Sequence, residues 1–486
     1  MNYRMMGRFI AQILFLEGLF MLPAMFISLA CGESSAAKAF ALTILLLLVI
    51  SGLLRILCRG AKSNFYATDG MVCVAVSWII LSLTGCLPFF ISREIPRFID
   101  ALFEIVSGFT TTGASILPAV EPLSKGILYW RSFSHWVGGM GVLVFVLAVA
   151  PSGDRGKGFT MHLLRAESPG PSVGKLVPKM RKNAAILSFL YMLLTVLNIL
   201  FLLLGKMPLF EAVCTAFGTA GTGGFGVKND SFAGYSPYLQ NVTTVFMMLF
   251  GVNFSCYYLL LLRRFRNVFK DEELRAYLGI AFCSFALIAW NIRGMYGSLG
   301  ETLRHAAFQV SSIMTTTGFA TTDFDLWPSF SKTILLCLMV IGASAGSTGG
   351  GIKVSRVVLL FKSLRRSFLQ MLHPNRIQVV RNNDQAVDEK VVESTNAYLI
   401  AYVFIMFISF LLLSLDGFST GTNFSAVLCC FNNIGPGLEA VGPTCNFSAF
   451  SVLSKLVLIL DMLLGRLEIF PILCLLSRHS WQRSIR

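Results

Sequence analysis

The sequence predicts an all-α polytopic membrane protein, in which an N-terminal two-helix hairpin precedes four units of helix, re-entrant pore loop and helix around one pore. Three observations predict this class. Of the 486 residues, 55% are hydrophobic and 13% charged, with a mean hydropathy of +0.70, whereas about a quarter of a soluble domain is charged. Apolar runs long enough to cross a bilayer recur along the chain. Between them, one short polar pattern ending in glycine occurs four times.

The first two apolar runs, 9–30 and 39–57, predict the hairpin, and a third run at 71–90 begins the first unit. Each is close to the roughly 20 residues that a spanning helix needs. Basic residues flank the hairpin at both of its ends: Arg4, Arg8, Arg55, Arg59 and Lys62. The positive-inside rule therefore places both ends in the cytoplasm. Because the first run is longer than the apolar core of a signal peptide, we interpret it as a span and not as a leader.

The net charge of +15 predicts membrane topology and not nucleic-acid binding. Most of it lies in three loops, 154–182, 263–275 and 353–390, whereas the loops between them mix acidic and basic residues. The basic loops are predicted to face the cytoplasm. The arginine-rich C-terminus is predicted to lie there as well, so both termini are cytoplasmic and the number of spans is even.

The repeated pattern reads Phe or Met, three further residues and then Gly. Its copies are Phe109 to Gly113, Phe217 to Gly221, Met314 to Gly318 and Phe431 to Gly435. Each copy ends an apolar stretch that is too short to span a bilayer but suits a re-entrant half-helix. These stretches are 98–107, 209–216, 303–313 and 423–430.

Chain order then predicts ten full spans and five segments. The first segment is the hairpin, and the other four are pore repeats, the third of which contains a gate loop. Their predicted limits are 1–66, 67–182, 183–272, 273–390 and 391–486.

Four polar turns inside the membrane predict a shared water-filled path for a monovalent cation. Non-helical backbone is tolerated at that depth only where it lines such a cavity. Rings of backbone carbonyls can replace the hydration shell of a cation, and glycine permits the backbone angles that point successive carbonyls toward one axis. No carboxylate lies inside any copy, which favours K+ or Na+ over Ca2+. A single copy would be read as a helix C-cap, but four matched copies favour an ion filter.

The predicted filter residues, which would bind K+, come from all four copies. They are Thr110, Thr111, Thr112, Gly113, Thr219, Ala220, Gly221, Thr222, Gly223, Thr315, Thr316, Thr317, Gly318, Asn432, Asn433, Ile434 and Gly435. The second copy leaves its glycine open. Matching Phe217 to Phe109 selects Gly221, whereas matching the Gly-Phe pair at 318–319 selects Gly224, and Gly223 is a third alternative.

A glycine-rich stretch, 342–351, interrupts the predicted second span of the third unit. Each glycine inside a helix costs about 1 kcal/mol relative to alanine, so the stretch predicts a broken helix and an intramembrane gate. The alternative is a small-residue packing face between helices. The gate candidates are Gly342, Ser344, Gly346, Ser347, Thr348, Gly349, Gly350, Gly351 and Arg466.

Arg466 lies inside the last predicted span, where a lone charge costs several kcal/mol. Asp461 and Glu468 are spaced so that they do not face it on a helix. We expect Arg466 to face the pore near the gate loop and to act as an electrostatic barrier. The alternative is an ion pair with an acid on a neighbouring span.

Other function classes fit the residues less well. Gly342 to Gly346 matches a serine hydrolase elbow, but a membrane span precedes it instead of a strand, so no enzyme is predicted. Ile352 interrupts the phosphate-loop pattern before Lys353, so no nucleotide site is expected in this chain. The twelve Cys residues include no CxxC pair and predict packing roles. The runner-up is a secondary transporter with a midplane solute site, which would predict paired inverted halves.

Five stretches together match a known family: 110–113, 218–226, 315–319, 342–351 and 432–437. Through them the chain resembles the membrane subunit of the Trk/Ktr/HKT potassium transporter superfamily, and most closely its bacterial TrkH-type members. The resemblance implies K+ uptake across the bacterial inner membrane, with the 342–351 loop as the gate below the filter. It also implies a homodimer with one pore per subunit and a cytoplasmic nucleotide-binding regulatory ring of TrkA type.

Overall fold

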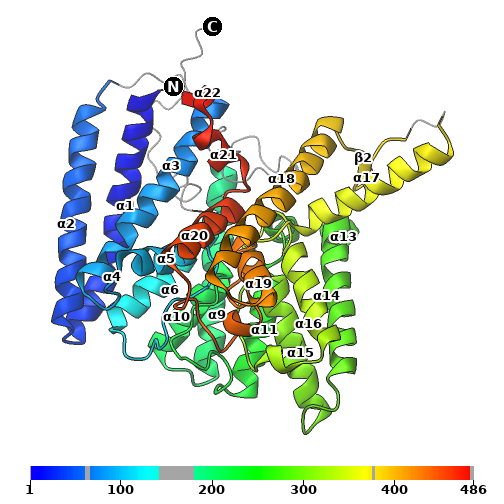
Figure 1. The fold of residues 1–486 in the computed structure, drawn as a ribbon, viewed down its shortest axis with the longest axis horizontal. Helices are drawn as coiled ribbons and strands as arrows, with labels where there is room; N and C mark the ends of the chain where they lie inside the picture. The colour runs from blue at the N-terminus through cyan, green and yellow to red at the C-terminus, as the bar shows by residue number, and fades with distance from the viewer. Residues whose placement is uncertain (1, 61–65, 142–179, 375–377, 482–486) are drawn as a thin grey trace.

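The computed structural model describes residues 2–60, 66–141, 180–374 and 378–481 (Figure 1). The predicted all-α class is confirmed, because the regular secondary structure of the described residues is helical apart from one short hairpin. In that hairpin β1 (Arg381–Asn382) pairs antiparallel with β2 (Gln385–Ala386). Most of the basic loop predicted at 154–182 lies outside the described residues.

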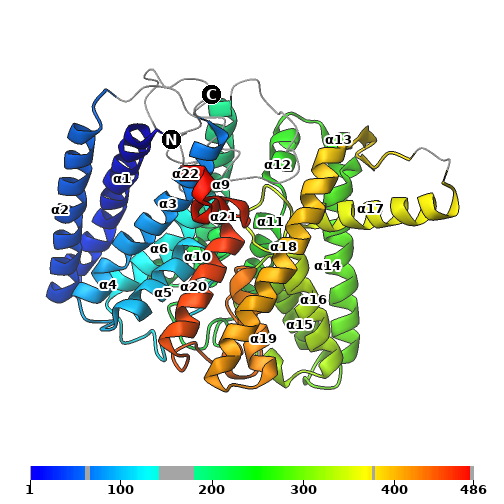
Figure 2. The same cartoon turned by 45° about the horizontal axis from the view of Figure 1, so that its top comes forward.

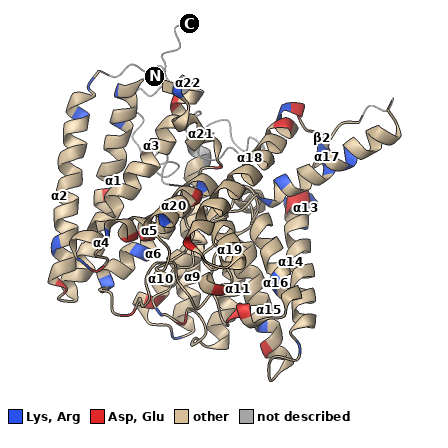
Figure 3. Cartoon of the chain, viewed as in Figure 1, with Lys and Arg blue, Asp and Glu red and all other residues tan. Residues whose placement is uncertain are grey.

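The N-terminal hairpin consists of α1 (Tyr3–Ala30) and α2 (Ser34–Leu57), which lie side by side at one edge of the molecule (Figure 1). The side chain of Asn2 caps α1 by accepting the amide of Met5 at 3.1 Å. Figure 3 shows α2 and α14 as mostly uncharged ribbons with their charges near the ends. Large apolar side chains such as Leu45, Ile56 and Leu57 are exposed on α2, which suits a surface that faces lipid.

The four units follow the hairpin in chain order. Unit one contains α3 (Ala67–Gly85), α4 (Leu87–Ile91), α5 (Phe98–Phe109) and α6 (Lys125–Met140). Unit two contains α9 (Met180–Leu204), α10 (Leu209–Gly221), α11 (Pro237–Phe250), α12 (Phe254–Leu261) and α13 (Phe265–Lys270).

Unit three contains α14 (Glu272–Asn291), α15 (Leu299–Met314), η1 (Phe324–Leu326), α16 (Ser329–Ile341) and α17 (Val354–Leu372). Unit four contains α18 (Glu389–Leu413), η2 (Ser414–Asp416), α19 (Thr420–Phe431), η3 (Glu439–Val441), α20 (Val452–Arg466), α21 (Phe470–Leu476) and α22 (Arg478–Trp481).

Six of the described helical segments are long and apolar enough to cross a membrane. A seventh candidate is the pair α11 and α12, which is bent by 89°. The prediction of ten full spans stays a prediction, because three of the predicted spans are broken helices and α6 ends next to residues outside the described part of the chain. The second helix of units two, three and four is broken, at 251–253, 342–353 and 467–469. Glycine opens the first two breaks. Gly342 with a φ of 71° and Ile469 with a φ of 68° mark the second and third, because these backbone angles end the regular helix.

The short helices α5, α10, α15 and α19 are the half-helices that the sequence predicts, and α10 is longer than predicted. Figures 1 and 2 show α5, α10 and α19 between the hairpin at one side and α14 and α16 at the other, and α15 beside α14 and α16. Each leads its chain into a polar turn whose threonine or asparagine side chains are buried. The two ends of the described chain meet on one side, where the hydroxyl of Tyr3 donates to the carbonyl of Trp481 at 3.3 Å.

Candidate functional site

The four polar turns after the short helices follow the same backbone course. In each turn one residue other than glycine adopts a left-handed conformation, namely Thr111, Thr222, Thr316 and Asn433 with φ of 58°, 55°, 60° and 55°. The next residue then donates its amide to the carbonyl five positions back, at 2.8 to 2.9 Å in all four turns. Three of the turns continue to a glycine with positive φ, namely Gly113, Gly224 and Gly318. These bonds fix which residues are equivalent.

The second turn corrects the register obtained by matching Phe217 to Phe109. Helix α10 continues to Gly221, so Thr219 and Ala220 belong to its last turn and Thr222 occupies the place of Thr111. Gly224 is then the counterpart of Gly113. The signal for this register was present in the sequence, because Gly224 precedes a phenylalanine as Gly318 does.

The four turns approach one another in cyclic order. A Cβ atom on Gly113 would lie 2.0 Å from the carbonyl oxygen of Gly223, and one on Gly224 would lie 2.1 Å from that of Thr317. Two further approaches close the ring. A Cβ atom on Gly318 would lie 3.1 Å from the nitrogen of Gly435, and one on Gly435 would lie 2.8 Å from the carbonyl oxygen of Gly113. Only glycine fits where neighbouring backbones come this close.

The side chains of the turns bond back into the protein. Asn433 donates to the hydroxyl of Thr112 at 3.0 Å and to the carbonyl of Met462 at 2.9 Å. In unit one the hydroxyls of Thr110 and Thr112 are hydrogen-bonded at 2.8 Å, and in unit three those of Thr315 and Thr317 are hydrogen-bonded at the same distance. Four carbonyls of these turns accept no hydrogen bond from the described residues. They belong to Thr112 and Gly113 in unit one and to Thr317 and Gly318 in unit three. They remain available to a ligand.

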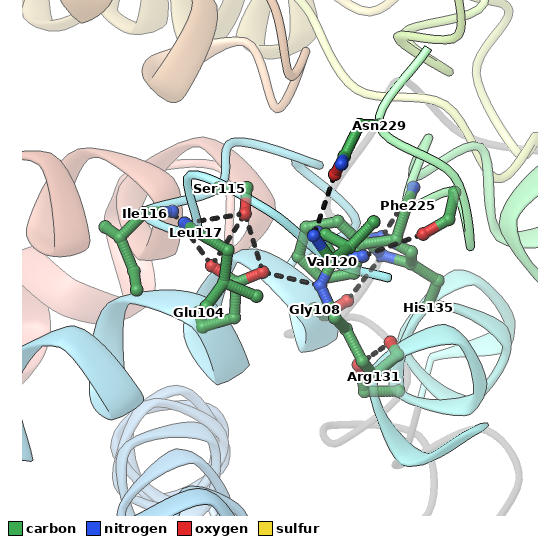
Figure 4. A network of polar contacts seen from close by, with 12 residues as sticks. Glu104, Gly108, Ser115, Ile116, Leu117, Val120, Arg131, His135, Phe225 and Asn229 are labelled. Carbon is green, nitrogen blue, oxygen red and sulfur yellow. Dashed lines mark hydrogen bonds and ion pairs between the residues drawn. The ribbon is translucent and has the colours of Figure 1, made fainter. Parts of the chain in front are cut away.

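A buried ion pair supports the turns of units one and two (Figure 4). Glu104 on α5 and Arg131 on α6 lie 2.5 Å apart and are both buried. Glu104 also accepts the amide of Ile116 at 3.0 Å, just after the first turn. Arg131 donates to the carbonyl of Gly226 at 3.0 Å and lies 3.6 Å from the ring centre of Phe225, just after the second turn. One pair therefore braces both turns.

His135 bridges the same two units (Figure 4). Its Nδ1 lies 2.9 Å from the carbonyl of Gly108, and its Nε2 accepts the amide of Phe225 at 3.3 Å. Nε2 is therefore the acceptor and Nδ1 the donor. The ring also fills the space beside Gly223, where an added Cβ would lie 2.2 Å from Nδ1. This contact leaves no space for a side chain at that position of the second turn.

Neighbouring units are also bonded outside the ring. Val120 donates to the side chain of Asn229 at 2.8 Å, joining units one and two. The amide of Glu439 donates to the carboxylate of Asp325 at 3.1 Å, joining units three and four. Separately, hydrogen bonds from Ser419 and Thr422 lower the pKa of the Glu439 carboxylate, so this side chain stays charged at neutral pH.

A cavity lies on each side of the ring. The outer cavity, of about 170 Å³, is lined by the ring glycines Gly113, Gly224, Gly318 and Gly435. The inner cavity, also of about 170 Å³, is lined by residues of the glycine-rich loop together with Lys353, Arg466 and Glu468. The ring and the loop therefore separate two polar spaces.

The glycine-rich loop lies against the inner side of the ring. The amide of Gly350 donates to the hydroxyl of Thr316 at 2.7 Å. A Cβ atom on Gly349 would lie 2.8 Å from the carbonyl oxygen of Thr315, and one on Gly350 would lie 2.3 Å from that of Asn432. Backbone of the loop therefore lies across this face of the ring.

The loop is docked on the break between α11 and α12. Ser344 donates its amide to the carbonyl of Gly251 at 3.1 Å, and Phe254 donates to the carbonyl of Gly346 at 3.1 Å. The hydroxyl of Thr348 donates to the carbonyl of Phe250 at 3.3 Å. The broken helix of unit two thus supplies the backbone groups that hold the broken helix of unit three.

Arg466 ends α20 and reaches the loop and unit one. Its guanidinium donates to the carbonyl of Thr348 at 3.0 Å and to the hydroxyl of Thr111 at 3.4 Å. It also bonds the carbonyls of Gly138 and Gly139 at the end of α6, where the helix dipole favours a cation. The carboxylate of Glu468 pairs with Arg356.

The sequence interpretation missed Glu104, Arg131 and His135. A signal for the first two was available, because a charge inside a predicted intramembrane helix is itself a functional indicator. Glu104 lies in the half-helix predicted at 98–107, and Arg131 lies in the helix that follows. Their partnership required the fold, because nothing in the chain order places α5 against α6 at these residues.

A family model described as TrkH, cation transport protein, matches residues 36–483. The chain belongs to the TrkH family. One relative, the Trk system potassium uptake protein TrkH of Salmonella typhimurium, is 35% identical to this chain. The match covers 99% of this chain and 100% of the relative. The potassium uptake protein TrkG of Escherichia coli is 33% identical over 97% of each chain. Both relatives are named as potassium uptake proteins.

A solved TrkH structure has the same fold as this chain. The crystal structure of the potassium transporter TrkH from Vibrio parahaemolyticus superposes with a TM-score of 0.88 at 32% identity. The match covers 99% of this chain and 100% of the crystallised one. This supports the assignment of the chain as a multi-pass membrane protein of the TrkH family.

Proposed function

We propose that this chain takes up K+ across the bacterial inner membrane through the ring of four turns. The observation that carries the proposal is the cyclic contact of the four turns at Gly113, Gly224, Gly318 and Gly435. Carbonyls that face a common axis and accept no protein hydrogen bond can replace the hydration shell of a cation. The K+ uptake named for the relatives agrees with this chemistry.

The filter is proposed to select for monovalent cations by neutral oxygen atoms alone. No carboxylate lies in the four turns, and divalent cations prefer sites with charged carboxylate ligands. The proposed filter positions are 110–113, 222–224, 315–318 and 432–435. This set includes Gly224 and leaves out Thr219 to Gly221, because those three residues belong to the last turn of α10.

The loop 342–353 is proposed to be the gate, in its closed position. Its contacts with Thr316 and Asn432 support this, because they put backbone across the inner face of the ring. Arg466 is proposed to add an electrostatic barrier, since a fixed positive charge beside the path opposes a permeating cation. Opening then requires the loop and the guanidinium to move together.

The partners follow the family resemblance and remain proposals. We propose a homodimer in the inner membrane whose cytoplasmic face binds a nucleotide-binding regulatory ring of TrkA type. The basic residues near both termini and the basic loops, such as 263–275, support this orientation. The nucleotide would act on the partner, because this chain lacks the phosphate-loop pattern.

Radioactive Rb+ flux into proteoliposomes, measured with and without competing Na+, tests the function. We expect Rb+ to enter down its gradient and K+ to compete more strongly than Na+. Broken helices also favour a second candidate, an alternating-access transporter. Single-channel currents in a lipid bilayer would support the pore, whereas coupled flux with no resolvable unitary current would support the transporter.

Removal of residues 346–350 is expected to raise Rb+ flux through the protein without its regulatory partner. The shortened loop cannot reach Thr316 and Asn432, so the inner face of the ring is left open. We expect an increase of about tenfold, equivalent to roughly 1.4 kcal/mol in the closing equilibrium. Unchanged or lower flux in a correctly folded variant would contradict the role of the loop as a gate.

A further inference from the structure

One carboxylate joins three separate elements around the glycine-rich loop. Glu273, in the first turn of α14, accepts the amide of Ala345 in the loop at 2.6 Å. It also accepts the amide of Ser355 in the first turn of α17 at 3.2 Å, and the side-chain amide of Asn253 at 3.4 Å. Asn253 caps α12, because its side chain accepts the amide of Ser255. Glu273 therefore contacts the loop, the helix after the loop, and the break on which the loop docks.

Acidic residues in the first turn of a helix commonly stabilise that helix. The simpler explanation for Glu273 is therefore that it stabilises the start of α14. Asp271 already caps α14 by accepting the amide of Leu274 at 2.8 Å. Glu272 pairs with Lys362 on α17. Among the described residues, Glu273 accepts hydrogen bonds from other elements and none from α14. The capping role is thus filled by Asp271, and the direction of Glu273 needs a different explanation.

The turn that carries Glu273 is fixed in place. The side chain of Asn383, in the β1–β2 turn, accepts the amide of Glu272 at 2.9 Å and donates to the carboxylate of Asp271 at 3.0 Å. Lys362 also donates to the carbonyl of Arg381 at 2.8 Å. Because these bonds hold the start of α14 against the hairpin and α17, the carboxylate of Glu273 meets the loop from a rigid support.

We propose that Glu273 is a positioning residue that latches the loop 342–353 in its closed position, an inference that rests on the proposed gating function of the loop. A charged acceptor forms hydrogen bonds about twice as strong as a neutral one. Without it the amide of Ala345 would lose its partner in a partly buried place. The latch sits outside the ion path and acts through the loop alone.

The test measures Rb+ flux in proteoliposomes without a regulatory partner, for Glu273→Ala and for a matched control. We expect Glu273→Ala to raise flux about tenfold, since one charged hydrogen-bond network is lost. The control is Glu389→Ala, which removes the first acid of α18 and its ion pair with Arg366 but has no contact with the loop. Its flux should stay near that of the unchanged protein. Glu273→Gln keeps one oxygen acceptor of nearly the same size, and its flux should lie between the two.

A second readout follows the loop directly. In a background without reactive cysteines, Ser347→Cys places a thiol in the wall of the inner cavity. Glu273→Ala should make this thiol react severalfold faster with a charged reagent added from the inner side, and Glu389→Ala should not. A structural role of Glu273 in α14 alone would leave the reaction rate unchanged. That result, in a protein that elutes as a single folded species, would overturn the latch.

The loop deletion separates this proposal from the gate itself. If removal of 346–350 raises flux while Glu273→Ala and Glu273→Gln do not, the gate stands and the latch is wrong. If neither the deletion nor Glu273→Ala raises flux, the gating function fails and the latch fails with it. Increases in both support the latch.

Discussion

Gly224→Ala is expected to lower Rb+ uptake at least about tenfold in cells that depend on this protein. Gly224 has a φ of 77°, and an added Cβ would lie 2.1 Å from the carbonyl oxygen of Thr317. The left-handed conformation alone costs an L-residue roughly 1–2 kcal/mol. The clash adds a displacement of the third turn, so the proposed filter is altered on two of its four sides.

Gly226→Ala is the matched control for this prediction. It lies two residues further on in the same loop, where a Cβ would be 3.4 Å from the carbonyl of Lys228, close to ordinary contact. Its backbone carbonyl can still accept Arg131. We expect its uptake to remain within about twofold of the unchanged protein, because the free-energy change should be a few tenths of a kcal/mol. Equal losses for both variants would contradict the register that makes Gly224 the ring glycine.

Glu104→Ala is expected to lower the free energy of unfolding by about 3–5 kcal/mol, because it leaves the buried guanidinium of Arg131 without its anion. Uptake should fall together with stability, since Ile116 loses its acceptor and the brace between the first two turns is broken. Thermal unfolding in detergent measures the first effect, and Rb+ uptake by the reconstituted protein measures the second.

Two controls test whether burial is the cause. Lys332→Ala removes a partly exposed ion pair with Asp325, whose two side chains are 29% and 25% exposed, and leaves the bond between Asp325 and Glu439 in place. It should cost only about 0–1 kcal/mol. The double variant of Glu104→Ala with Arg131→Ala should be less destabilised than the sum of the single changes, because the two groups interact directly. Simple additivity would contradict the pairing as the source of the effect.

The residue types of the site were predictable where local chemistry decides them. Helices α5, α15 and α19 end at Phe109, Met314 and Phe431, each at the first residue of a predicted copy. Apolar stretches too short to span, followed by polar residues and glycine, can only turn back within protein. The break at 342–351 follows in the same way from glycine and its cost in a helix.

The second turn shows where such local reasoning ends. Phe217 begins a pattern that matches Phe109, yet α10 continues to Gly221 and Thr222 enters the turn. The length of that helix depends on what surrounds it. His135 and the first turn leave room only for backbone at Gly223, and neither contact is encoded near residue 223 in the chain.

By itself, the sequence determined the membrane class, the four polar turns, the glycine-rich break and the presence of Arg466, because composition, segment length and glycine content act locally. The tertiary structure decided the cyclic order of the turns, the Glu104–Arg131 brace, and the bonding of Arg466 to Thr348. It also decided the contact of Glu273 with the loop. Each of these joins residues from different units, and such partners are chosen by how the helices pack and by the need to satisfy buried polar groups.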